Sequence, residues 1–163
     1  MRILTLMASG PIALLAVATL AGCSEEPTPP PSGEFGGTVT YQSQGAPATT
    51  EVNGVADEAK VSGTAVTTFG EPTHSVQLEC SVRDGETWAV GGKTAQTTVA
   101  GEKAGDWSAV IVREGTPQQI LIWLSADPSD ASDCAAWLSA IDPATIDSEN
   151  FVSVESGTLV PPS

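Results

Sequence analysis

The chain has few residues of several chemically important kinds. Only 6 of its 163 residues are Lys or Arg, against 20 Asp or Glu, and the formal net charge is −14. So acidic a chain lacks the cationic surface that nucleic-acid phosphates require. One His and three Cys exclude most metal sites built from imidazole and thiolate, because such sites need several of these ligands. We therefore expect no nucleic-acid partner, no metal and no other cofactor.

Motifs for catalysis are missing as well. His74 is the single imidazole, and we expect it at a solvent-facing strand end near a surface turn. The chain contains no Gly-x-Ser-x-Gly elbow, which a serine hydrolase of the α/β class would need. Its 20 acidic residues include no pair that the spacing singles out as a glycosidase acid and base. The sequence predicts a protein that is not an enzyme and has no catalytic residue.

The first 22 residues have the pattern of an export signal. Arg2 precedes a nearly unbroken apolar and small stretch over residues 3–20, which is typical of a secretory signal. Its length is close to that of a membrane span, so a retained helix is the alternative. Residues 20–23, Leu-Ala-Gly-Cys, resemble a bacterial lipobox, which implies cleavage before Cys23 and acylation of its thiol. We expect a cleaved lipoprotein signal over residues 1–22 and a lipid anchor at Cys23 on the extracytoplasmic face of the cell membrane.

A proline-rich segment follows the expected anchor. Residues 24–33 include four prolines in five positions and no apolar residue suited to a core. Such a composition favours extended polyproline II, which acts as a stiff spacer. A ligand for an aromatic-lined groove is the alternative, but it would need a cytosolic partner. The expected organisation is a lipidated Cys and tether over residues 23–33 and one β-rich domain over residues 34–163.

The remaining residues show the periodicity of short strands. Residues 74–82 alternate, with Val76, Leu78, Cys80 and Val82 on one face. Two segments, 107–112 and 119–124, are apolar on both faces, which favours central strands. Further strands, separated by Gly, Asn-Gly and Asp-Gly turn signals, are expected over residues 37–42, 48–52, 61–69, 86–90, 94–100 and 151–160. The pattern predicts a mainly β fold, an antiparallel sandwich or small barrel of about eight strands with one short helix.

The one helix is expected over residues 127–141. An Asp-Pro pair opens this segment, and a second pair at 142–143 ends it. Asp127, Asp130 and Asp133 could suggest a calcium loop, but their spacing differs from the alternate ligand positions of an EF-hand. We interpret the three acids as residues that cap the helix and favour its first turn.

Two cysteines remain once Cys23 is assigned to the lipid. Cys80 lies in a predicted strand and Cys134 in the predicted helix, both at core-facing positions. In an exported protein such a pair is expected to form a disulfide, with two buried free thiols as the alternative. A Cys80–Cys134 bond would fasten the helix to the sheet.

Aromatic residues supply the one candidate for ligand binding. Trp123 lies in an uninterrupted apolar segment and is expected in the core. Trp88 follows a turn and has the polar neighbours Glu86 and Thr87, so we expect it to be exposed, with packing beneath a loop as the alternative. Exposed aromatic side chains often dominate the binding energy of an interface. We therefore favour a non-enzymatic interaction module for an envelope protein or glycan, with a carrier of an apolar, lipid-like ligand in a β-rich cavity as the alternative.

Four short segments resemble those of a known family. Val52-Asn53-Gly54, residues 76–80, Gly85 and Val90-Gly91-Gly92 are similar to the LpqH-type family of mycobacterial lipoprotein antigens. That family shows a strand ending near an Asn/Asp-Gly turn, a Cys-ended strand, a Gly turn and an Ile/Val-Gly-Gly step. The resemblance implies an envelope-exposed lipoprotein with two further cysteines and no established catalysis. This chain departs from the family pattern because Cys134 is not near the C-terminal end and the linker is rich in Pro.

Overall fold

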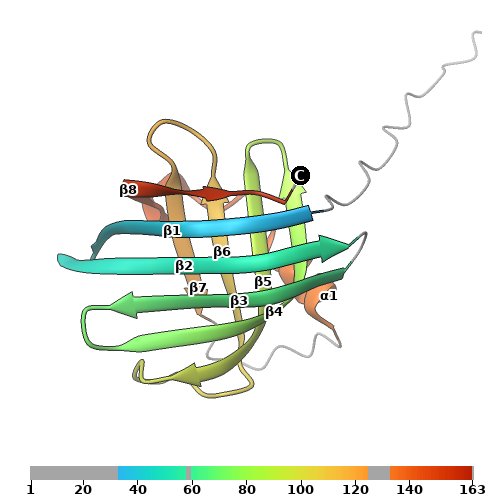
Figure 1. Ribbon diagram of the computed structural model, residues 1–163, viewed down its shortest axis with the longest axis horizontal. Helices are drawn as coiled ribbons and strands as arrows, with labels where there is room; N and C mark the ends of the chain where they lie inside the picture. Colours follow the sequence, from blue (N-terminus) through green and yellow to red (C-terminus); the bar gives the residue numbers. More distant parts are fainter. Residues whose placement is uncertain (1–32, 58–59, 125–132, 163) are drawn as a thin grey trace, which may run out of the picture.

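The computed structural model describes residues 33–57, 60–124 and 133–162. Within them, eight antiparallel strands follow one another in chain order and close into a barrel (Figure 1). The strands are β1 (Gly33–Ser43), β2 (Ala46–Asp57), β3 (Lys60–Phe69), β4 (Thr73–Asp84), β5 (Thr87–Thr97), β6 (Trp107–Arg113), β7 (Gln119–Leu124) and β8 (Val152–Val160). The predicted mainly β class is confirmed, and the architecture is the barrel. The predicted signal peptide, the acylated Cys23 and most of the tether lie outside the described residues.

The barrel closes through hydrogen bonds between its first and last strands. In β1, Gly36 to Tyr41 pair with Val160 to Val154 of β8, and the sheet therefore has no free edge. The chain enters β1 at one end of the barrel, which is also where β8 ends (Figure 1). β1, β3, β5 and β7 all run from this end to the opposite one.

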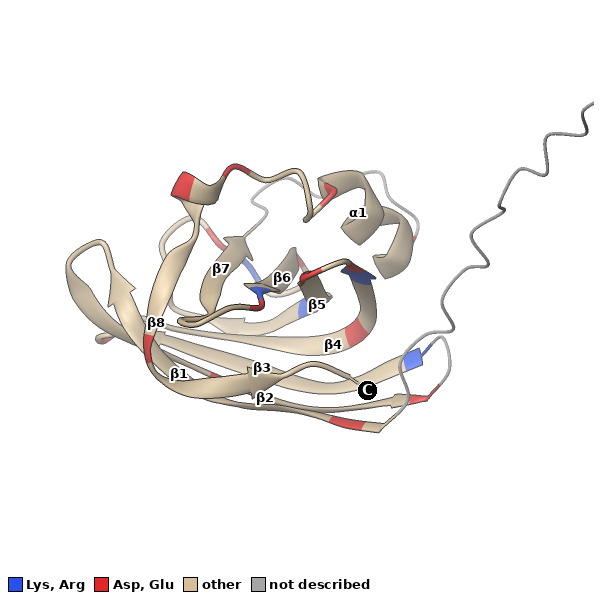
Figure 2. Ribbon diagram, turned by 90° about the horizontal axis from the view of Figure 1, so that it is seen from above, with Lys and Arg blue, Asp and Glu red and all other residues tan. Residues whose placement is uncertain are grey.

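The core consists of two apolar clusters on opposite faces of the barrel wall. The inner cluster fills the barrel with side chains from all eight strands, among them Val39, Val52 and Trp88. The outer cluster lies beneath helix α1 (Cys134–Ile141), which covers the outer face of β4 and β5 (Figure 2). β6 is buried on both faces because it contributes to both clusters, which explains its continuous apolar sequence.

Strand β5 corrects the prediction of two strands separated by Gly91-Gly92. The structure has one strand from Thr87 to Thr97, and the glycines lie within it. A Cβ at Gly92 would overlap the Gln77 carbonyl oxygen of β4, so glycine permits this close approach of the two backbones. The two glycines therefore lie within a continuous strand, and the prediction of a strand end was wrong.

Strand β4 also departs from its predicted alternation. The register between β4 and β5 shifts between Leu78 and Cys80, which indicates a bulge at Glu79. Val76 and Leu78 consequently point into the barrel, whereas Cys80 and Val82 join the outer cluster. The expectation that all four share one face was wrong, because one extra residue reverses the alternation.

A disulfide links Cys80 of β4 to Cys134 at the start of α1, as expected. Asp133 caps the helix, and its side chain accepts a hydrogen bond of 2.8 Å from the Ala136 N–H. The predicted helix start at residue 127, and Asp130 with it, lie outside the described residues. No helix in the described part of the chain is long and apolar enough to cross a membrane.

Candidate functional site

A cavity of about 360 Å³ opens at the end of the barrel opposite the start of β1. We call this cavity the mouth. It is lined by residues from the ends of β1, β3 and β7, from the start of β2 and from the adjoining turns and loops: Ser43, Gln44, Ala46, Phe69, Pro72, Val99 and Leu124. Most of these side chains are apolar. The mouths of small barrels are common positions for ligand pockets.

Below the mouth lies a layer of buried polar side chains, one from each of the first six strands. We call it the polar layer: Tyr41, Thr50, Thr67, His74, Thr94 and Ser108. All six residues are at most 2% exposed. They occupy inward-facing positions, since they alternate with outward residues along strands that supply the inner apolar cluster. These six residues contrast with the apolar side chains of the inner cluster that fill the rest of the barrel.

Two hydrogen-bonded groups make up most of the polar layer. The Tyr41 hydroxyl is 2.9 Å from Thr50 Oγ1, which is 3.0 Å from Thr67 Oγ1. Thr94 Oγ1 is 2.9 Å from Ser108 Oγ. His74 lies between the two groups. It pairs with Thr67 of β3, and Val76, the next inward-facing residue of the same strand, pairs with Thr94 of β5.

Along the strands, three residues that line the mouth lie two positions from residues of the polar layer. Ser43 follows Tyr41 by two residues, Phe69 follows Thr67 by two, and Pro72 precedes His74 by two. Side chains two residues apart in a strand lie on the same face at a spacing of roughly 7 Å. A ligand in the mouth would therefore be surrounded by mainly apolar side chains, with the polar layer beneath it.

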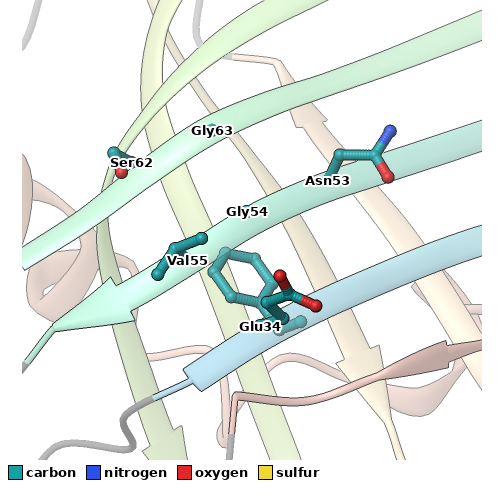
Figure 3. A pocket seen from close by; sticks show the side chains of 7 residues that line it. Glu34, Asn53, Gly54, Val55, Ser62 and Gly63 are labelled. Atoms are coloured by element: carbon teal, nitrogen blue, oxygen red, sulfur yellow. The ribbon is translucent and has the colours of Figure 1, made fainter.

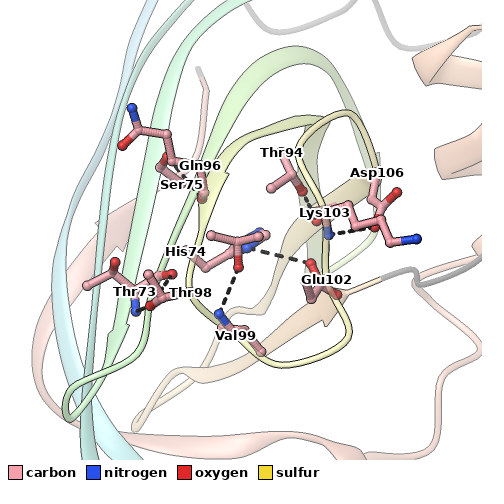
Figure 4. A network of polar contacts seen from close by, with 12 residues as sticks. Thr73, His74, Ser75, Thr94, Gln96, Thr98, Val99, Glu102, Lys103 and Asp106 are labelled. Carbon is pink, nitrogen blue, oxygen red and sulfur yellow. Dashed lines mark hydrogen bonds and ion pairs between the residues drawn. The ribbon is translucent and has the colours of Figure 1, made fainter.

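Glu102 lies on the loop between β5 and β6, and its side chain points toward His74 (Figure 4). Its Oε2 is 3.6 Å from His74 Nδ1, and the two side chains are only 5% and 1% exposed. Neither nitrogen of His74 nor Oε2 of Glu102 has a hydrogen-bond partner among the described residues. Buried polar atoms without partners are costly, so this pair is an exception that calls for a physical explanation.

The base of the β5–β6 loop is fixed by backbone hydrogen bonds. Thr98 N–H donates to the Thr73 carbonyl at 2.9 Å, and Thr73 N–H donates to Thr98 Oγ1 at 2.9 Å. At the other side of the loop, Thr94 N–H donates to the Asp106 carbonyl at 2.8 Å. These bonds hold the loop over the barrel end and account for the burial of Glu102.

Burial changes the proton affinity of both members of the pair. It lowers the pKa of the His74 imidazole below the ordinary value, because a charged ring is poorly solvated there. Burial, and then repulsion from the Asp106 carboxylate, raise the pKa of the Glu102 carboxyl. Burial also raises the pKa of the Tyr41 phenol, and its hydrogen bond to Thr50 opposes that shift.

A second, shallower depression lies on the outer face of the barrel wall (Figure 3). Its volume is about 480 Å³, and its lining includes Glu34, Asn53, Val55 and Ser62. Gly54 also belongs to its lining, and a Cβ at this position would overlap the Phe35 ring of the inner cluster. Its polar lining residues Glu34, Asn53 and Ser62 are exposed, whereas the mouth adjoins the buried polar layer, so we regard this depression as the weaker candidate.

Two predictions about single residues were wrong. Trp88 is 1% exposed and belongs to the inner cluster, because it faces inward on β5. His74, expected in solvent, is 1% exposed because the β5–β6 loop covers its strand end. Trp123 is half-buried and packs against the outer cluster. Among the described residues, no three His, Cys, Asp or Glu side chains are grouped to hold a metal ion.

The sequence analysis did not predict the polar layer, although the alternation of two strands is consistent with it. Thr50 has the same parity in its strand as the buried Ala48 and Val52. Thr67 likewise follows the parity of Ala65 in β3. Alternation alone therefore places these hydroxyls inward. It does not reveal that six strands bring such residues to one level, which depends on the register around the barrel.

Acidic residues are spread around the barrel, with few cations among them (Figure 2). The fold and the mouth define a small closed antiparallel barrel with a ligand-sized opening at one end. Comparisons with protein families, with curated proteins and with solved structures find no match.

Proposed function

We propose that this protein is a membrane-anchored lipoprotein of the bacterial envelope whose barrel carries a small, mainly apolar ligand in its mouth, without catalysis. The observation that carries this proposal is the apolar mouth of about 360 Å³ above a layer of buried polar residues. A ligand pocket typically combines an apolar lining with a few polar groups that fix orientation. The anchor rests on the lipobox-like residues 20–23.

The carrier is favoured over the surface module by the position of Trp88. The surface module needed an exposed aromatic contact residue, and Trp88 is 1% exposed. Exposed large apolar residues on the described surface are the valines Val55, Val66 and Val160, which offer less contact area than an aromatic anchor. The mouth, in contrast, has the size and lining of a small-molecule site.

The proposed anchor also fixes the direction in which the mouth opens. The tether would join the barrel at Gly33, where β1 begins, and the mouth lies at the opposite end, beside Ser43. A barrel anchored through Cys23 would then present its mouth away from the bilayer. The ligand would enter from the extracytoplasmic space and not directly from the membrane.

Filling the mouth tests the carrier. The neutral fluorescent probe N-phenyl-1-naphthylamine should bind the chain that begins at Ser24, which contains every described strand. Ser43→Phe places an aromatic ring in the mouth and should weaken probe binding at least about tenfold, roughly 1.4 kcal/mol. Ser62→Phe, the matched change in the outer depression, should leave probe binding unchanged. The opposite ranking of the two variants, or no probe binding by the parent chain, would contradict the proposal.

Replacing the expected acyl acceptor tests the anchor. Cys23→Ala removes the thiol that would carry the diacylglycerol, so metabolic labelling with radioactive palmitate should disappear. The variant should also leave the detergent phase in phase partitioning. Unchanged partitioning would mean that the apolar segment is a retained membrane helix.

A further inference from the structure

We propose that the mouth takes short apolar peptides, whose extended backbone adds to the edge of β7 while their side chains fill the cavity. This inference rests on the proposed carrier function and names the chemical class of the ligand. It starts from Leu124, the last residue of β7, which lines the mouth. Leu124 and Ile122 are half-buried, so this end of the strand is accessible from outside.

Strand β7 extends beyond its pairing with β8, the strand that closes the barrel. The pairing of β7 with β8 ends at Ile120, which faces Val152, whereas β6 accompanies β7 as far as Leu124. The chain before Val152 leaves the barrel wall, since Phe151 belongs to the outer cluster. Residues 121–124 therefore have a strand neighbour on one side only among the described residues.

One hydrogen bond shows which backbone groups of β7 lie on the unpaired side. Val154 N–H donates to the Gln118 carbonyl at 2.8 Å, so Gln118 faces β8. The N–H and C=O groups of successive residues alternate between the two sides of a strand. Ile122 and Leu124 therefore direct theirs away from β6, and among the described residues no backbone hydrogen bond reaches them on that side. A ligand can pair with these two N–H groups and two carbonyls.

The mouth beside this edge suits the side chains of an added peptide strand. Its lining contains no charged residue, so it favours neutral apolar side chains over charged ones. Ile122 packs against the inner cluster and Trp123 against the outer one, and an added strand would alternate in the same way. Side chains opposite Ile122 and Leu124 would enter the mouth, and the one between them would face outward beside Trp123.

The peptide backbone distinguishes this ligand class from other apolar molecules. When an extended peptide adds to a sheet edge, its main-chain hydrogen bonds supply affinity and its alternate side chains supply specificity. A fatty alcohol of similar volume would fill the same cavity but could not pair with all four backbone groups of Ile122 and Leu124.

Three tripeptides test the backbone pairing. Acetyl-Leu-Thr-Leu-amide, with both Leu side chains inward, should displace N-phenyl-1-naphthylamine from the chain that begins at Ser24. N-methylation of its third residue removes an N–H that faces β7 and should weaken displacement about tenfold. N-methylation of its central residue removes an N–H that faces away from β7 and should leave displacement nearly unchanged. If both methyl groups weaken displacement equally, or neither does, the strand addition is overturned and the carrier stands.

Two variants at one position test the same pairing from the side of the protein. Leu124→Pro removes the N–H that would donate to the peptide, at a position where a strand tolerates proline because this N–H faces away from β6. Leu124→Ala keeps the N–H and controls for the shorter side chain in the mouth. Binding of acetyl-Leu-Thr-Leu-amide should be about tenfold weaker in Leu124→Pro than in Leu124→Ala, while the two variants bind the probe with similar affinity.

Equal peptide binding by the two variants would contradict the inference. Should Leu124→Pro not fold, the comparison of the two methylated peptides on the parent chain still decides. If the parent chain binds no probe at all, the carrier itself is refuted, and the peptide preference with it.

Discussion

The strongest test of the packing is the replacement of Trp88, the largest fully buried side chain of the barrel. Trp88 lies in the inner cluster, 1% exposed, so Trp88→Ala leaves a cavity among side chains from several strands. Tryptophan-to-alanine changes at such positions cost about 3–5 kcal/mol. A domain of this size has a free energy of unfolding of about 5–15 kcal/mol, so the variant should lose a large part of its stability.

A second replacement separates the ring volume from the indole N–H. Nε1 of Trp88 is buried without a hydrogen-bond partner among the described residues, and such a donor destabilises a fold by about 1–3 kcal/mol. Trp88→Phe removes this donor and keeps much of the aromatic volume. We therefore expect its net loss of stability to be about 1 kcal/mol, well below that of Trp88→Ala.

Urea denaturation of the variants, followed by circular dichroism, measures these differences. Trp123→Ala is the matched control, because Trp123 is half-buried against the outer cluster, and we expect a loss of only about 1–2 kcal/mol there. A loss below 1 kcal/mol for Trp88→Ala, or a larger loss for Trp123→Ala, would refute the assignment of Trp88 to the filled interior.

Two further predictions concern the disulfide and the buried pair. Replacing both Cys80 and Cys134 by Ala should lower the free energy of unfolding by about 4 kcal/mol, because the bond spans 54 residues of chain; unchanged urea midpoints would contradict this. The pKa of His74 is lowered in the folded protein, so the protonation of His74 destabilises the fold as pH falls below the ordinary value of 6.5. The pKa of Glu102 is raised in the folded protein, so the ionisation of Glu102 destabilises the fold as pH rises above 4.5. Relative to the parent chain, Glu102→Gln should therefore gain stability as pH rises from 4.5, and His74→Gln should lose stability as pH rises toward 6.5. Slopes of the same sign would show that these two groups do not control the pH dependence.

The sequence by itself was sufficient for the local features of this fold. Alternation and turn residues predicted about eight strands, because side-chain burial in a strand has a period of two. The count of cysteines predicted the Cys80–Cys134 bond, and Asp133 was correctly interpreted as a capping residue. Each of these properties depends on residues a few positions away in the sequence or on the number of cysteines in the chain.

Features that depend on distant parts of the chain were decided by the tertiary structure alone. Trp88 has polar neighbours in sequence, yet its inward direction follows from the register of β5 in a closed barrel. The bulge before Cys80 reverses the alternation of β4, and no local pattern marks it. His74 and Glu102 are 28 residues apart, and they meet because a loop folds over the barrel end. The polar layer exists because six strands align their inward polar residues at one level, and that alignment is a property of strand register and barrel closure.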